Sequence, residues 1–571
     1  MKLRALRPIG FILAVIVVVG YVSTQSNGSF TLPWDGELDR DEAIERLAKL
    51  TRDVGPAEAF VTRRAQVELG SQIELTDTLP AIDEFPLVVV PASGARAASV
   101  EIFVSTEKSG SGTDGWMVEV AQAFNRTQRN TSNGKPAQVA VRKIASGTGY
   151  QYIASGKYRP QAFSPSNHLW IRMAEAYDVK MTPVRERLVG NVAGIVMKEA
   201  AASKLEGNYE SVEVRNVIDA VVRGDLAMGY TNPFASSTGL NFLVTVLSTF
   251  SAGDETAMLS PEVLSAFEGF QRGVPFVALT TLQMRDSVAR DGSLEAFVME
   301  QQTFAKTPAL QSGYRFVPFG IRHDNPLYAV GEPDEHTLEV LEMLAKFAEQ
   351  PTYVKLADEY GFNPSLDYTP AFEAPAGDTI VQAQRVWKEK KDAGRPIAAV
   401  FLCDVSGSMR GERLWRVKQA LLQGSEFISA NNAIGMVTFS DRVSMVLPVQ
   451  QFDLNHKSAF RAAVEDMDAA GNTAMYDGVV VSLSMLSNAI SANPKARPML
   501  FVLTDGETNR GLNFSEVERV ITGVNVPVYT IGYEADLDEL GRLSQLVEAA
   551  SINADQGEIE YKIGSLLNAQ M

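Results

Sequence analysis

The sequence predicts an α/β protein built from two successive units. Strand-like apolar runs alternate with helical patterns from about residue 85 onward, which is typical of sheets covered by helices on both faces. At 571 residues the chain exceeds one ordinary hydrophobic core. A stretch rich in proline and small residues, "PSLDYTPAFEAPAGDT", is typical of a boundary between the two units.

The composition excludes two classes of site. A net charge of −17 argues against a nucleic-acid-binding surface and favours attraction of cations. The single cysteine, Cys403, excludes an internal disulfide and any paired-cysteine metal or redox motif.

Residues 1–30 have the pattern of a signal anchor or a signal peptide. Three basic residues precede an uncharged apolar segment from Ile9 to Val22, which as a helix would span roughly 21 Å. No Ala-x-Ala cleavage pattern follows it, so we expect an uncleaved anchor, with cleavage left open. The basic end would stay in the cytoplasm, which places the bulk of a single-pass chain outside the cell membrane. Residues 31–84 are expected to form a stalk or cap, because 36–70 are polar with a helical rhythm.

Residues 85–365 place small hydroxyl side chains and glycines after successive strands. The segments concerned are "STEKSGSGT" (105–113), "SGTG" (146–149), "SPSNHLW" (164–170) and "NPFASSTGLNF" (232–242). Ligands of open α/β sheets bind outside the carboxyl ends of the strands, and hydroxyls suit a small polar ligand. For any single segment, ordinary turn formation explains the same residues.

This region resembles the extracytoplasmic solute-binding proteins of ABC importers, the periplasmic-binding type 2 fold with two lobes. The resemblance is carried by "FVSTEKSGSG", "FSPSNHLW" and "GYTNPFASSTGLNFL", the last being expected where that fold crosses between lobes. It implies a ligand cleft lined near Ser105, Thr106, Ser146, Gly147, Ser164, Ser166, Ser237 and Thr238. The sequence departs from that family in lacking a cluster of lysines or arginines for an oxyanion, so the solute stays open.

Residues 366–396 are expected to be a linker and a connecting helix. The helical pattern "IVQAQRVWKEKKDAG" ends at Gly394 and Pro396, residues that terminate helices.

Residues 397–571 predict a doubly wound α/β domain. The run "IAAVFLCD" is continuously apolar, as in a strand buried on both faces. Asp404 closes that strand and Asp505 follows a later one, "PMLFVLT". The carboxyl ends of parallel strands share one edge of a sheet, so we expect both carboxylates at that edge.

Five oxygen-bearing residues are expected to meet there. Ser406 and Ser408 follow Asp404 in "DVSGS", Thr473 precedes a helix in "GNTAMYDG", and Asp505 stands in "LTDGETN". Two carboxylates and three hydroxyls are hard oxygen donors that suit Mg²⁺.

Two other interpretations explain parts of this pattern. Asp, Ser and Thr are common helix N-caps, so capping alone explains "DVSGS" in isolation. An aspartyl-phosphate mechanism would use Asp404 as nucleophile, but that chemistry usually has a second acid two residues on, where this chain has Ser406.

The order Asp404-x-Ser406-x-Ser408, then Thr473, then Asp505 resembles the metal-ion-dependent adhesion site (MIDAS) of von Willebrand factor type A domains. The resemblance implies a Rossmann-like fold and a Mg²⁺ or Mn²⁺ ion at the top of the sheet. It also implies an open coordination position for a carboxylate from a partner protein. Such domains bind proteins and rarely catalyse, so we expect no enzyme.

The function predicted from the sequence is cation-dependent binding of a protein partner by an exported, membrane-anchored chain. One alternative is a transport receptor that captures a small polar solute in residues 85–365. A second alternative is a metal-dependent phosphatase.

Overall fold

The computed structural model describes residues 38–571 except 68–74, 93, 95–98, 210, 275, 279–280, 282–283, 286–287, 289–293, 364–367, 371, 392–393, 507, 534–539, 541–542, 544–550 and 555–558. The predicted signal segment, residues 1–30, lies outside the described residues. Within the described ranges, no helix has both the length and the apolar character that crossing a membrane requires.

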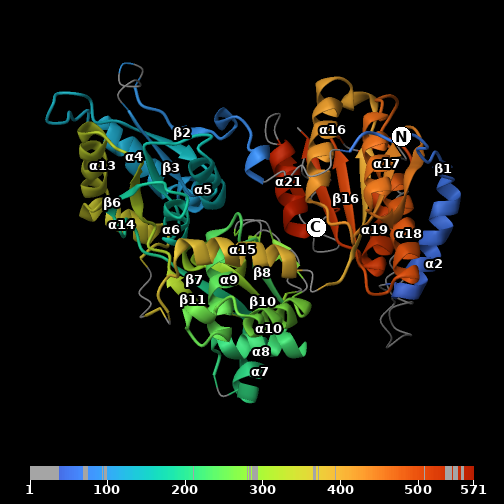
Figure 1. Cartoon of the computed structure of the whole chain (residues 1–571), viewed down its shortest axis with the longest axis horizontal. Coiled ribbons are helices and arrows are strands. Elements are labelled where there is room, and N and C mark those ends of the chain that lie inside the picture. The colour runs from blue at the N-terminus through green and yellow to red at the C-terminus, as the bar shows by residue number, and fades with distance from the viewer. Residues whose placement is uncertain are drawn as a thin grey trace, which may run out of the picture.

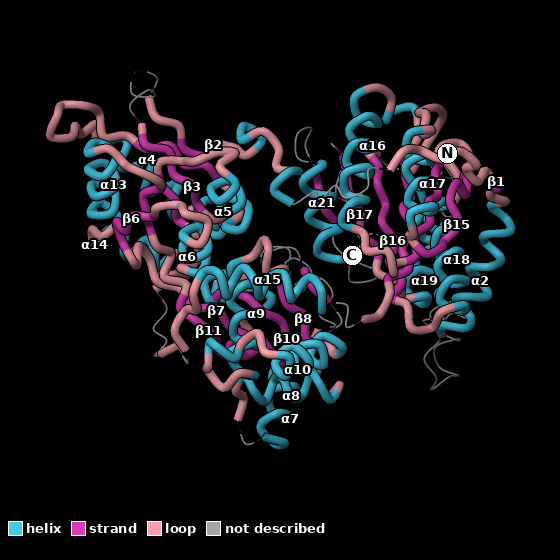
Figure 2. Tube along the Cα trace, viewed as in Figure 1, coloured by secondary structure: helices cyan, strands magenta, loops and turns pink. Residues whose placement is uncertain are grey.

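The described chain contains three mixed or parallel sheets, each covered by helices, which confirms the predicted fold class (Figures 1 and 2). Two of the sheets form a two-lobed module, and the third forms a separate C-terminal domain.

Lobe 1 is a six-stranded sheet in the order β2-β4-β3-β5-β12-β6. Its parallel centre is β4, β3 and β5, and the other strands pair antiparallel. The strands are β2 (Leu87–Val89), β3 (Val100–Val104), β4 (Val139–Lys143), β5 (Ala162–Ser164), β6 (Met181–Arg185) and β12 (Leu327–Val330). The helices are α3 (Thr106–Ser109), α4 (Trp116–Arg126), α5 (Ser146–Ser155), α6 (Leu169–Glu175), α13 (Glu335–Ala348) and α14 (Pro351–Glu359).

Lobe 2 is a five-stranded sheet in the order β11-β7-β10-β8-β9. Its strands are β7 (Val192–Lys198), β8 (Met228–Thr231), β9 (Phe276–Ala278), β10 (Ala296–Glu300) and β11 (Tyr314–Arg322). Its helices include α7 (Glu199–Tyr209), α8 (Val214–Arg223), α9 (Ser237–Phe250), α10 (Pro261–Arg272) and α12 (Gln301–Ala305).

The chain crosses between the lobes at 186–191 and again at 323–326, between β6 and β7 and between β11 and β12. The segment "GYTNPFASSTGLNFL", expected at a crossing, lies instead inside lobe 2. It forms β8 and the first half of α9, because its apolar residues Phe242 and Leu243 continue as a buried helix face.

The predicted connecting helix is α15 (Gly377–Lys390), and it packs on the two-lobed module. It contacts α6 of lobe 1 and α9 and α10 of lobe 2. Its buried Trp387 donates a hydrogen bond from Nε1 to the Tyr230 hydroxyl (2.6 Å). α15 therefore spans both lobes on one side (Figure 1).

The C-terminal domain is a seven-stranded sheet in the order β1-β15-β14-β13-β16-β17-β18. The strands are β1 (Ala57–Glu58), β13 (Ile397–Asp404), β14 (Ala433–Phe439), β15 (Val443–Gln451), β16 (Arg497–Thr504), β17 (Val528–Tyr533) and β18 (Ser551–Ala554). All eight residues of β13 are buried, as its continuous apolar run predicts. One face is covered by α16 (Glu412–Gly424), α17 (Leu454–Glu465) and α21 (Ile559–Gln570), and the other by α18 (Met475–Ala492) and α19 (Phe514–Val524).

The segment expected to form a stalk or cap packs on this C-terminal domain. Its helix α2 (Arg40–Val54) is capped by Asp39, whose side chain accepts from Glu42 N, and ends at the left-handed Gly55 (φ +60°). Ala43 and Leu47 of α2 are buried against α18 and α19 (Figure 1). The two residues of β1 then pair in parallel with Ser444 and Met445 of β15. The sheet and its helix layer are thus completed by residues that precede the two-lobed module.

Helix α21 joins the C-terminal domain to both lobes. The hydroxyl of its buried Tyr561 lies 2.9 Å from Thr148 Oγ1 and donates to Gln151 Oε1 (3.0 Å), both on α5 of lobe 1. Gln570 Nε2 donates to the Val277 carbonyl of β9 in lobe 2 (3.2 Å).

Candidate functional site

The two predicted metal-site acids lie at adjacent strand ends in the C-terminal domain. β13 and β16 run in parallel with Cys403 opposite Leu503, so Asp404 and Asp505 emerge at the same edge of the sheet. Counting backbone and side chain together, Asp404 is 1% exposed and Asp505 is 9% exposed. The residues that follow β13 turn through a short 3₁₀ segment at Gly407–Met409, which contains Ser408 and is preceded directly by Ser406.

A continuous chain of hydrogen bonds links four of the five predicted residues. Ser406 N donates to Asp404 Oδ1 (2.7 Å), and the Ser406 and Ser408 hydroxyls lie 3.0 Å apart. Ser408 Oγ then donates to Asp505 Oδ1 (2.8 Å). Ser408 is exposed, so this side of the cluster opens to solvent.

Thr473 is held near the cluster through its loop. Gly407 N donates to the Gly471 carbonyl (2.9 Å), an approach so close that a Cβ at Gly407 would lie 3.2 Å from that oxygen. On the other side, Thr473 N donates to Asn509 Oδ1 (2.8 Å), four residues beyond Asp505. Among the described residues, no hydrogen bond joins the Thr473 hydroxyl to the other four.

The electrostatics of this cluster favour a bound cation. Burial raises the pKa of Asp404, and the charge of Asp505 raises it further, while hydrogen bonds from Thr504 and Ser406 lower it. A divalent cation would relieve the repulsion between the two carboxylates. In the described part of the chain no three His, Cys, Asp or Glu residues form a metal-binding group, so a metal here would rely on hydroxyls beside two acids. This hard-oxygen set fits Mg²⁺ or Mn²⁺.

Two further residues belong to the cluster and were not predicted. The Thr504 hydroxyl donates to Asp404 Oδ2. Arg413 Nη1 donates to Asp505 Oδ2 (2.7 Å) and to the Ser408 carbonyl (3.3 Å). Thr504 directly precedes Asp505, so its place at a strand end was available from the sequence. Arg413 carries no such signal, because its acidic partner, Asp505, is 92 positions away.

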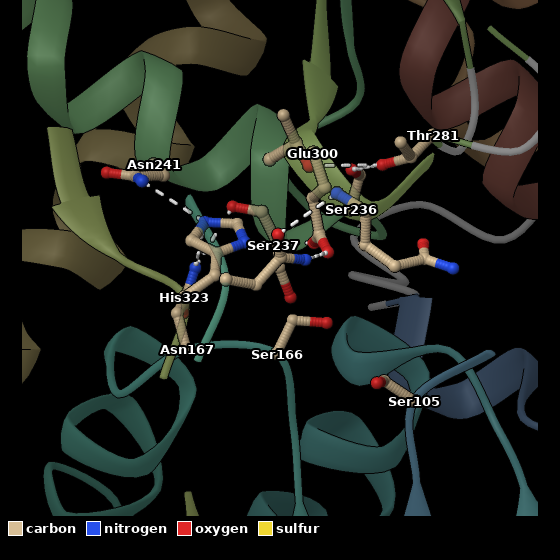
Figure 3. A network of polar contacts seen from close by, with 12 residues as sticks. Ser105, Ser166, Asn167, Ser236, Ser237, Asn241, Thr281, Glu300 and His323 are labelled. Carbon is tan, nitrogen blue, oxygen red and sulfur yellow. Dashed lines mark hydrogen bonds and ion pairs between the residues drawn. The ribbon is translucent and has the colours of Figure 1, made fainter. Parts of the chain in front are cut away.

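The eight residues predicted for the solute cleft gather where the two lobes meet. Gly147 N of lobe 1 donates to the Ala235 carbonyl of lobe 2 (3.3 Å). Figure 3 shows Ser105 and Ser166 of lobe 1 in the lower half of the view, and Ser236, Ser237 and Thr281 above them. Asn167 Nδ2 bridges the lobes by donating to the Ser237 carbonyl (3.2 Å).

Most of these predicted groups are satisfied by neighbouring protein groups. Ser166 N donates to Ser146 Oγ (3.3 Å), and Trp170 Nε1 donates to Ser237 Oγ (2.8 Å). The Thr238 hydroxyl lies 3.1 Å from Thr281 Oγ1. Thr106 is half-buried at the first residue of α3. The hydroxyls of Ser164 and Ser166 are fully buried and have no hydrogen-bond partner among the residues that the structure describes.

Charged side chains that sequence reasoning missed fill this inter-lobe region. Lys108 is fully buried and donates from Nζ to Ser105 Oγ (3.0 Å), the Ser164 carbonyl (2.8 Å), the Pro165 carbonyl (3.1 Å) and Asn325 Oδ1 (3.1 Å). His323 Nδ1 lies 2.9 Å from Glu300 Oε1, and its Nε2 lies 3.1 Å from Asn167 Nδ2 (Figure 3). His323 has no ligand spacing to another histidine in the sequence, so only the fold reveals this pair.

A surface cavity of about 1000 Å³ lies beside the lobe crossings. It is lined by α6, by residues of both crossings such as Glu186 and Asp324, and by the segment before α15. None of the eight predicted residues lines it. The predicted cleft residues and this cavity are therefore separate features.

Residues 399–560 match the family model of the von Willebrand factor type A domain. The chain contains a von Willebrand factor type A domain. Inter-alpha-trypsin inhibitor heavy chain H1 of Mesocricetus auratus is 30% identical over 151 residues, which are 24% of this chain and 16% of that protein. The chain thus spans less than a fifth of that relative.

Solved structures similar to this chain include members of both families that the sequence resembles. A von Willebrand factor type A protein from Catenulispora acidiphila is 17% identical, with a TM-score of 0.28, over 30% of this chain and 42% of that one. The sulfate-binding protein SubI from Mycobacterium tuberculosis H37Rv is 17% identical, with a TM-score of 0.34, over 51% of this chain and 96% of that one.

Within the von Willebrand factor type A domain, the matched segment begins inside β13 and includes all five predicted metal-site residues. β1 and α2 lie outside the matched residues, although they complete the sheet and one helix layer.

Proposed function

We propose that this chain is an exported, membrane-anchored protein whose von Willebrand factor type A domain binds a partner protein through a divalent cation. Asp404, Ser406, Ser408, Thr473 and Asp505 would hold Mg²⁺ or Mn²⁺, and the partner would supply a carboxylate. The observation that carries the proposal is the hydrogen-bonded chain that joins two buried carboxylates through two serine hydroxyls at one sheet edge.

The bound cation would supply a positive charge that polarises and holds an incoming carboxylate. The residues of the chain would do the rest: Asp404 and Asp505 provide negative charge, and the hydroxyls provide neutral oxygen donors. Ser408 lies at the solvent side, where a partner group would arrive. The proposed membrane anchor is residues 1–30. Their basic residues would stay in the cytoplasm, and the binding domain would lie on the outer side of the membrane.

A thermal-shift titration with MgCl₂ tests the metal site. We expect Mg²⁺ to raise the melting temperature of the wild type, because a ligand that binds only the folded state stabilises it. Asp404→Asn should abolish that rise, whereas Asp468→Asn, which changes an exposed acid of the same domain, should keep it. Equal melting of the wild type in Mg²⁺ and in EDTA would overturn the metal site.

A pull-down from envelope extract tests the partner. The bait is the chain from Asp35 onward, in Mg²⁺ and in EDTA, with Asp404→Asn as the paired variant. A protein retained only in Mg²⁺, and lost with Asp404→Asn, is the expected result. The same proteins captured in both buffers would contradict cation-dependent binding.

A second candidate function is capture of a small polar solute by the two-lobed module. It is favoured by the Ser164 and Ser166 hydroxyls, which find no partner within the described ranges, because buried polar groups in proteins are usually hydrogen-bonded. A solute-dependent rise in melting temperature that persists in Asp404→Asn and is lost in Ser166→Ala would support it. A panel of polar solutes with no effect on the wild type would count against it.

A further inference from the structure

Arg413 donates a hydrogen bond to one carboxylate oxygen of the candidate metal site, Asp505 Oδ2. It is the second residue of α16, which begins directly after Gly411, a glycine with φ +86° that turns the chain out of the serine segment. This turn brings the Arg413 guanidinium back over the strand edge. Its Nη1 lies 2.7 Å from Asp505 Oδ2, and the Arg413 side chain is 38% exposed while that of Asp505 is 1% exposed.

Both oxygens of Asp505 are therefore engaged by protein donors. Oδ1 accepts from the neutral Ser408 hydroxyl, and Oδ2 accepts from the cationic guanidinium. Asp404, by contrast, accepts from Ser406 and from the Thr504 hydroxyl, which are neutral donors. Among the ion pairs of the described residues, the one that reaches these two acids joins Arg413 to Asp505.

A guanidinium and a divalent cation cannot share one carboxylate oxygen without mutual repulsion. The pair is charge-assisted and its acid is desolvated, which makes it stronger than a fully exposed ion pair. Its arginine is more than a third exposed, so the guanidinium can move into water when it is displaced.

We propose that Arg413 competes with the divalent cation for Asp505 and thereby sets the metal affinity of the site. This inference rests on the proposed metal site and adds its regulation: the guanidinium neutralises Asp505 without metal and leaves it when the cation binds.

Isothermal titration of the full chain with Mn²⁺ and with Mg²⁺ tests the competition. Arg413→Ala should bind each ion about five- to tenfold more tightly than the wild type, a ratio that corresponds to the loss of about 1–1.4 kcal/mol of competition. Arg413→Gln retains a hydrogen-bond donor without the charge and should also bind more tightly. Arg416→Ala is the matched control, because Arg416 lies one turn further along α16 and pairs with Glu412 (2.9 Å). Its metal affinity should equal that of the wild type.

A second readout separates competition from a purely structural role. Arg413→Ala should melt at a lower temperature than the wild type in EDTA, because the buried Asp505 carboxylate then has neither the guanidinium nor a metal ion beside it. The rise in melting temperature on adding Mg²⁺ should be larger than in the wild type. A structural role alone would lower the melting temperature equally in both buffers.

The outcomes distinguish this inference from the proposed function. If neither the wild type nor Arg413→Ala binds metal, both fail. If the wild type binds metal and the two Arg413 variants bind it equally or more weakly, the competition is wrong and the metal site stands.

Discussion

Glu107 and Lys108 are consecutive residues of α3, and both are buried where the two lobes meet. Burial, and secondly the nearby charge of Glu300, raise the pKa of Glu107 to about 7. Burial lowers the pKa of Lys108 to about 7. Neither residue was predicted, because a lysine beside a glutamate in "STEKSG" is also the pattern of an ordinary solvated turn.

The Glu107 carboxyl makes the stability of the module depend on pH. Its pKa is higher in the folded chain than in the unfolded one, so its contribution is present below about pH 4.5 and is lost as the pH rises toward 7. We expect Glu107→Gln to gain stability over the wild type as the pH rises through this window, by at most about 3 kcal/mol.

Urea unfolding at pH 4.5, 5.5, 6.5 and 7.5 checks this difference. Tryptophan fluorescence reports on the module, because Trp116, Trp170 and Trp387 are buried in it. Glu389→Gln, which changes an exposed glutamate of α15, serves as the control and should follow the wild type. A constant difference between Glu107→Gln and the wild type at all four pH values would contradict the prediction.

The candidate metal-site residues show which groupings of side chains a sequence can predict. The meeting of Asp404, Ser406, Ser408 and Asp505 at one sheet edge, with the Thr473 loop beside them, was predictable, because each residue follows a strand or precedes a helix in a domain whose strand ends must meet. Arg413 was not, because a basic residue near the start of a helix indicates no particular partner.

At the scale of secondary-structure elements, α2 illustrates a related limit. Its capping residues and its apolar positions Ala43 and Leu47 predict a helix with one buried face. They do not say which surface covers that face; in the segment expected to be a stalk or cap, α2 packs on α18 and α19. The alternation of strands and helices, by contrast, reveals the fold class of both units because it depends on local pattern alone.

The contact of α2 with α19 requires a glycine. A Cβ at Gly523 would lie 2.6 Å from Ala43 Cβ and 3.1 Å from the Leu38 carbonyl. We expect Gly523→Ala to destabilise the von Willebrand factor type A domain by about 1–3 kcal/mol, since overpacking outweighs the higher helix propensity of alanine.

Differential scanning calorimetry measures this effect. Gly269→Ala in α10 is the matched control, because a Cβ there meets no atom within 4 Å. It should leave stability unchanged or raise it by up to about 1 kcal/mol. Equal melting of Gly523→Ala and the wild type would show that α2 does not need this close packing.

At the scale of the whole molecule, several elements hold the two lobes together. α15 contacts both lobes, and α21 of the von Willebrand factor type A domain binds α5 in lobe 1 and β9 in lobe 2. Gly147 lies at the contact itself, and a Cβ there would lie 2.1 Å from the Phe234 carbonyl oxygen.

Gly147→Ala should therefore separate the lobes. We expect small-angle X-ray scattering to give a larger radius of gyration than for the wild type, because the clash is with backbone across the contact. Gly207→Ala, at a helical position of α7 with open space around it, should scatter like the wild type. An unchanged radius for Gly147→Ala would mean that the lobes do not depend on this close approach.

The packing of α2 on α18 and α19 also matters while the chain is being made. The ribosome produces residues 40–54 more than 400 residues before their partners at 475–524. At the usual pace of about 5–20 residues per second, this leaves the apolar side of α2 without its partners for roughly 20–90 s. The first helix of the described residues is thus made long before the helices that cover it. A recombinant fragment that begins at residue 397 would lack both this helix and the edge strand β1, however well it matched the boundaries of its family.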